Sequence, residues 1–107
     1  MRDIKFIKVD MTNTPNTEKL TAKDIHHQAL KSGLRGIGHH FVIDKAGKVE
    51  PGRPMSETAY CNGQDNKVTV GILCVGTSLN TNQKEAIDKI VGEIKDEYPF
   101  VKVLNLV

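Results

Sequence analysis

The sequence predicts a single α/β domain in which helices flank a central mixed β-sheet. Residues 68–75 form an almost continuous apolar and β-branched run, which is typical of a strand covered on both faces. Residues 22–32 and 81–97 carry apolar side chains at helical spacing. Shorter strand-like runs lie at 4–10, 40–43, 48–50 and 101–106. A chain of 107 residues supports one hydrophobic core, so we interpret 1–107 as one layer-packed domain.

The first strand is predicted over residues 4–10, where apolar side chains occur at alternating and adjacent positions. Residues 11–17 are rich in Thr, Asn and Pro, so we expect a loop over the end of that strand. The first helix is expected over 22–32. Thr21 and Asp24 have the spacing of a capping box at its start, and Gly33 follows its end.

Residues 40–43 and 48–50 are predicted to pair as a hairpin. Gly47 is available for a turn position with positive φ, and Gly52 and Pro54 end the second arm. The long helix over 81–97 has an apolar stripe, with charged residues largely on its other side. Its stripe consists of Ala86, Ile87, Ile90, Val91 and Ile94. A short terminal strand is expected over 101–106.

The composition indicates an ordinary globular protein, with 38% hydrophobic and 26% charged residues. Its 15 basic and 13 acidic residues are scattered along the chain, so a nucleic-acid partner is not expected. No apolar stretch approaches a signal-peptide core or the ~20 residues of a membrane span. We therefore expect no membrane partner and a cytoplasmic protein, which cell lysis could release. Cys61 and Cys74 lie in different elements without CxxC spacing, and we expect both to be reduced.

Three stretches together carry a resemblance to a known family. Residues 33–43 read GLRGIGHHFVI, residues 47–53 read GKVEPGR, and residues 57–63 read ETAYCNG, ahead of TVGI at 69–72. In order and spacing they resemble the signature of the zinc-dependent N-acetylmuramoyl-L-alanine amidases. That family includes phage lysozyme-type amidases and animal peptidoglycan-recognition proteins. The resemblance covers residues 4–107 and implies the amidase fold, a zinc cofactor and peptidoglycan as substrate.

The resemblance also implies where the zinc ligands belong. The first family ligand is a His at the end of the opening strand, and Asp10 occupies that position here. The second is a His at the end of the strand after the long helix, and the third lies in a C-terminal segment. Here that strand reads LNLV over 104–107, and no further segment follows. A catalytic zinc needs three protein ligands and an open position, so we expect no cofactor and no hydrolysis.

A metal site rebuilt from other residues is the alternative. The four histidines occur as two adjacent pairs, His26 with His27 and His39 with His40. Neighbours point about 100° apart on a helix and to opposite faces on a strand, so neither pair forms an HxxxH-like chelate. The weak candidate ligands that remain are Asp10, His39 and Cys61. Cys61 with His39 is also considered as a nucleophile and base pair.

Two further residues are given structural roles. His40 is predicted to be buried and hydrogen-bonded, where it fixes the packing of its strand. Gly71 interrupts an apolar strand, which suggests that another backbone or side chain approaches it closely.

The polar residues near the family's catalytic water also differ. The resemblance implies that the family's Tyr before the strand His becomes His39, and that its loop His becomes Tyr60. Arg53 can reach a carboxylate or phosphate with its planar guanidinium. The predicted ligand groove is lined by Asp10, His39, Arg53, Tyr60 and Asn62, with no residue assigned as catalytic.

Three functions are therefore considered. The first is a non-catalytic module that binds a muropeptide-like or other small polar ligand. The second is an active amidase with an altered metal site. The third is a phage-type interaction protein that uses the scaffold to block or sequester a protein or signalling molecule.

Overall fold

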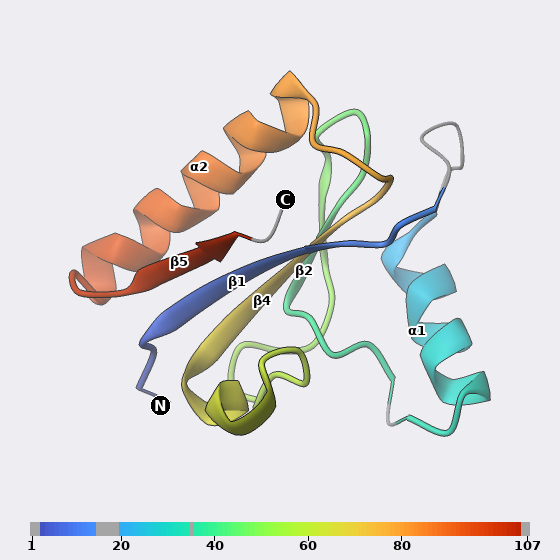
Figure 1. The fold of residues 1–107 in the computed structure, drawn as a ribbon, viewed down its shortest axis with the longest axis horizontal. Helices are drawn as coiled ribbons and strands as arrows, with labels where there is room; N and C mark the ends of the chain where they lie inside the picture. The colour runs from blue at the N-terminus through green and yellow to red at the C-terminus, as the bar shows by residue number, and fades with distance from the viewer. Residues whose placement is uncertain (1–2, 15–19, 35, 106–107) are drawn as a thin grey trace.

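The computed structural model describes residues 3–14, 20–34 and 36–105. Its sheet has five strands in the order β3-β2-β4-β1-β5 (Figure 1). β1 runs parallel to both β4 and β5, β2 runs parallel to β4, and β3 pairs antiparallel with β2. The predicted mixed sheet with flanking helices is therefore confirmed. The elements are β1 Phe6–Met11, α1 Ala22–Lys31, β2 Phe41–Ile43, β3 Val49–Pro51, the 3-10 helix η1 Gly63–Val68, β4 Thr69–Cys74, α2 Thr81–Glu97 and β5 Lys102–Asn105.

β4 lies at the centre of the sheet, and all six of its residues are buried. This confirms the prediction that residues 68–75 contain a strand covered on both faces. One face packs against α2, where apolar residues of β1 and β4 meet the helix stripe. This cluster includes Ile7, Val9, Val70, Ile72, Ile87, Ile90 and Ile94. The β1–β4 register, which pairs Val9 with Ile72, sets these side chains side by side.

The other face carries α1 in a smaller cluster formed by Leu20, Ala22, Ile37, Val42 and Val75. The predicted capping box is confirmed. The Asp24 amide donates to the Thr21 hydroxyl at 3.2 Å, and the Thr21 amide donates to the Asp24 carboxylate at 3.1 Å. The helix ends at Lys31, one residue before the predicted end, with Ser32 as its C-cap. α1 thus covers the β2 side of this face of the sheet.

α2 begins at Thr81 as predicted, but the residues that hold its start were not anticipated. Asn80 caps the helix by accepting from the Gln83 amide at 2.8 Å. The side chain of Gln83 is fully buried and donates to the carbonyls of Val75 and Ile43, at 2.9 and 3.3 Å. A buried amide that bonds two strand ends fixes where the helix lies relative to the sheet.

Other predicted boundaries shift. The first strand covers 6–11 rather than 4–10, and the hairpin arms cover 41–43 and 49–51. His39 and His40 precede β2 instead of alternating along it. η1, at 63–68, was not predicted. Residues 15–17 of the predicted loop and residue 106 of the predicted terminal strand lie outside the described residues. Within the described part of the chain, no helix is long and apolar enough to cross a membrane.

Candidate functional site

A polar cluster lies on the face of the sheet opposite α2, beside the region that α1 covers. β1 alternates: Ile7 and Val9 are fully buried in the α2 core, so Lys8 and Asp10 project from the other face. Their side chains keep 18% and 23% of their surface exposed. β1 therefore carries a cation and a carboxylate, both within reach of solvent, onto one face of the sheet.

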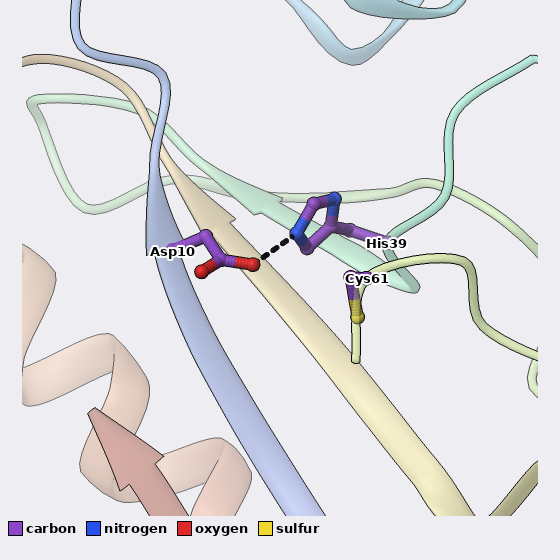
Figure 2. Close-up of side chains that lie close together, drawn as sticks. All are labelled: Asp10, His39 and Cys61. Atoms are coloured by element: carbon purple, nitrogen blue, oxygen red, sulfur yellow. Dashed lines mark hydrogen bonds and ion pairs between the residues drawn. The ribbon is translucent and has the colours of Figure 1, made fainter. Parts of the chain in front are cut away.

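Gly71 makes room for the rest of the cluster. It lies in β4 directly beside Lys8 of β1, where a Cβ would stand only 2.8 Å from Cys61 Sγ and 3.0 Å from His39 Cδ2. The missing side chain lets His39 and Cys61 lie directly on the strand (Figure 2). The predicted close approach at this glycine is confirmed.

Asp10 and His39 form the central contact. His39 Nε2 lies 2.8 Å from Asp10 Oδ2 (Figure 2), and the His39 side chain is 14% exposed. Lys8 Nζ lies 3.5 Å from the other carboxylate oxygen, Oδ1. Burial on its own raises the pKa of the Asp10 carboxyl, but the hydrogen bond and charge of His39, together with Lys8, hold it below its ordinary value. Asp10 is therefore an anion that two partners share.

Cys61 completes the cluster. One ligand atom from each of Asp10, His39 and Cys61 lies within 4.8 Å of the other two. Lys8 Nζ donates to the Cys61 carbonyl at 2.9 Å, which ties the loop to β1. A carboxylate oxygen, an imidazole nitrogen and a thiol sulfur thus face one point. This donor set suits zinc-like metals better than magnesium or calcium.

The loop around Cys61 is held by neighbouring amides. Asn66 Oδ1 accepts from the amides of Cys61 and Asn62, at 3.0 and 2.7 Å. The side chain of Asn62 donates to Thr69 Oγ1 at 3.0 Å. The Tyr60 side chain is 63% exposed, whereas its backbone amide donates to the Gly38 carbonyl at 2.9 Å. Cys61, rather than its neighbour Tyr60, therefore lies beside His39.

Arg53 lies in a different environment from the Asp10–His39 pair. Its Nε donates to the Ile37 carbonyl at 3.0 Å and its Nη1 to the Thr58 carbonyl at 2.6 Å. With Tyr60 and Leu34 it lines a hollow of about 430 Å³ that includes neither Asp10 nor His39. Of the five predicted groove residues, the structure brings Asp10 and His39 together, whereas Arg53 and Tyr60 line this separate hollow. Asn62 supports the loop.

His40 and His26 have structural contacts away from the Asp10–His39 pair. His40 is buried at 2% exposure, with Nε2 2.8 Å from the Glu57 carbonyl and Nδ1 accepting from the Gly71 amide at 3.1 Å. Its predicted structural role is confirmed. His26 Nδ1 accepts from the Ile37 amide at 3.1 Å, which joins α1 to the segment before β2. Within the described residues, neither Cys61 nor Cys74 forms a disulfide.

Comparison with known proteins finds similarity at the level of structure. No family model matches the sequence, and no curated protein matches it. The amidase LysC from Clostridium intestinale superposes with a TM-score of 0.86 at 20% identity, covering 97% of this chain and 70% of that one. Bumblebee PGRP-SA gives 0.83 at 22% identity, covering 95% and 69%. A Drosophila PGRP-LB mutant in complex with tracheal cytotoxin gives 0.83 at 18% identity, covering 98% and 70%. The chain therefore has the fold of the N-acetylmuramoyl-L-alanine amidases and the peptidoglycan recognition proteins.

Proposed function

We propose that this protein is a non-catalytic module that binds a small polar ligand of the peptidoglycan-fragment class. The Asp10–His39 pair, at 2.8 Å on the sheet face opposite α2, is the observation that carries the proposal. The carboxylate is an anion held by two basic groups, and an imidazole has a second ring nitrogen that can donate or accept a hydrogen bond. Such a pair orients hydrogen bonds to a ligand without breaking a bond.

The ligand class follows from the chemistry of this face together with the fold. A muropeptide offers amides, hydroxyls and carboxylates, which are partners for the carboxylate of Asp10 and the cation of Lys8. A solved structure with the same fold contains bound tracheal cytotoxin. Arg53 and Tyr60, at the neighbouring hollow, add a guanidinium and an aromatic face for a longer ligand.

The test is a calorimetric titration of the untagged protein with a soluble muropeptide in buffer that contains a chelator. Asp10→Asn keeps the shape of the side chain but removes its charge, and we expect roughly tenfold weaker binding because a charge-assisted hydrogen bond is lost. The exposed Asp88→Asn in α2 is the matched control and should bind like the parent. Saturable binding, with no release of peptide from the sugar when the protein is also incubated with added zinc and no chelator, supports the module. Absence of binding in the parent protein would overturn it.

A second candidate is an amidase with an altered metal site. The convergence of Asp10, His39 and Cys61 favours it, because these side chains supply three ligands of types found in zinc enzymes. Release of the peptide from a muropeptide after zinc is added, and its loss with chelator, would select the amidase over the module.

A further inference from the structure

We infer that Asp10, His39 and Cys61 form a binding site for a divalent transition metal of the zinc class. Only Asp10 occupies a position that the family resemblance assigns to a ligand, so the set differs from the one that the resemblance implies. The inference is independent of the proposed function. A chain that binds metal but no muropeptide would retain it, and a chain that binds muropeptide but no metal would lose it.

The geometry supports a three-ligand site. The side chains come from three separate segments, namely β1, the approach to β2 and the loop before η1, and they meet over β4 (Figure 2). Gly71 supplies the space, since a Cβ there would lie within 3.0 Å of both Cys61 and His39. Because the three atoms already lie within 4.8 Å of one another, small side-chain rotations bring them onto one ion.

The arrangement also shows what must change when metal binds. Ligand atoms on one tetrahedral zinc stand roughly 3.3–3.7 Å apart, given bond lengths of about 2.0–2.3 Å. The Asp10–His39 hydrogen bond, at 2.8 Å, must therefore open slightly. Lys8 faces Oδ1 of Asp10 while His39 faces Oδ2, so Oδ2 can bind the ion while Lys8 continues to orient the carboxylate.

The donor chemistry selects the metal. A thiolate and an imidazole favour zinc, cobalt or copper, whereas magnesium and calcium require oxygen ligands. Three protein ligands leave a fourth position for water or for a ligand group. The second ring nitrogen of His39 lies away from the cluster: in Figure 2 it is on the upper edge of the ring, while the Cys61 sulfur lies below it.

Cobalt(II) provides the test, because a cobalt–thiolate bond has its own charge-transfer band in the near ultraviolet. The untagged protein, residues 1–107, is kept reduced and titrated with cobalt and then with zinc. We expect one equivalent per chain, a thiolate band, d–d bands of four-coordinate intensity and displacement of cobalt by zinc. Cys61→Ser should abolish the thiolate band, and Asp10→Asn should weaken zinc binding on the order of tenfold or more.

His27→Gln is the matched control, because His27 is exposed on α1 and should leave both titrations unchanged. Circular dichroism checks that each variant is folded. If Cys61→Ser does not fold, the zinc affinity of Asp10→Asn tests the site. Less than one equivalent of cobalt in the parent protein would overturn the site. So would a thiolate band that persists in Cys61→Ser, or zinc affinity that is unchanged in Asp10→Asn.

Discussion

Substitution of Gly71 by alanine tests whether the site depends on the empty position in β4. The new Cβ would meet Cys61 Sγ at 2.8 Å, His39 Cδ2 at 3.0 Å and His39 Cα at 3.2 Å. Both side chains can rotate, but the His39 backbone must also give way. Overpacking of this kind costs about 1–3 kcal/mol, and the lower entropy of the unfolded alanine chain offsets about 0.4–1 kcal/mol.

The difference of these two ranges centres on a loss of about 1.3 kcal/mol, so we expect Gly71→Ala to lower the free energy of unfolding by roughly 1 kcal/mol or more. For a domain of this size that corresponds to a melting temperature lower by roughly 4 °C or more. Gly92→Ala is the matched control, because Gly92 lies inside α2 and a Cβ added there would have no heavy atom within 4 Å. It should raise stability by about 0.5–1 kcal/mol, since alanine is the better helix former.

Thermal and urea unfolding measure both variants, and the ring proton signals of His39 report whether its contact with Asp10 has changed. Equal stability of Gly71→Ala and the parent, with an unchanged His39 spectrum, would refute the reasoning. That result would mean that His39 and Cys61 do not lie against β4. A loss of stability in both glycine variants would point to a general sensitivity of the fold.

Three groups outside the cluster lead to further predictions. His40→Ala should destabilise the protein by about 2–4 kcal/mol in urea unfolding, because it removes a buried ring and leaves a strand amide without its acceptor. Burial raises the pKa of the Cys74 thiol to about 12, so a thiol reagent at pH 8 should modify only Cys61 in the native protein and both cysteines in denaturant; two fast-reacting native thiols would contradict this. Hydrogen bonds from the backbone and hydroxyl of Thr21 lower the pKa of Asp24, so its contribution to stability is present above its unfolded pKa and is lost as the pH falls through the lower folded value. Asp24→Asn should therefore flatten stability-versus-pH curves below about pH 4, and an unchanged acid slope would contradict the assignment.

The sequence predicts the regular elements well, because their signals are local. The apolar run at 68–75 and the stripe of 81–97 each identify a core element without knowledge of its neighbours, and both are found. The Thr21–Asp24 capping box is equally local. Gln83 was not predicted to be buried, since one of the two carbonyls that it binds, that of Ile43, is 40 residues away in the sequence.

The site was predicted only in part for the same reason. Asp10 and His39 were expected at the site only because the family resemblance assigns their positions to a zinc ligand and to a tyrosine near the catalytic water. The choice between Tyr60 and Cys61 depends on how one loop closes. Asn66 binds two successive amides of that loop, and the Tyr60 amide binds Gly38, so the backbone turns the thiol inward and the phenol outward. Sequence spacing does not predict which of two neighbouring side chains points inward when contacts between side chains and the backbone decide how the loop closes.

The binding-module proposal and the metal-site proposal both use the same atom, Asp10 Oδ2. In the ion-paired state this atom accepts from His39, and the cluster presents a fixed charge pattern that suits recognition. If a metal ion binds, the same oxygen and the same imidazole nitrogen would be its ligands, and a substrate would contact the fourth coordination position of the ion. One carboxylate oxygen cannot serve both arrangements fully, so if both proposals hold, a metal ion and a muropeptide would compete for it. An aspartate at this position is compatible with both arrangements, because its carboxylate can accept a hydrogen bond from the imidazole or ligate zinc beside it.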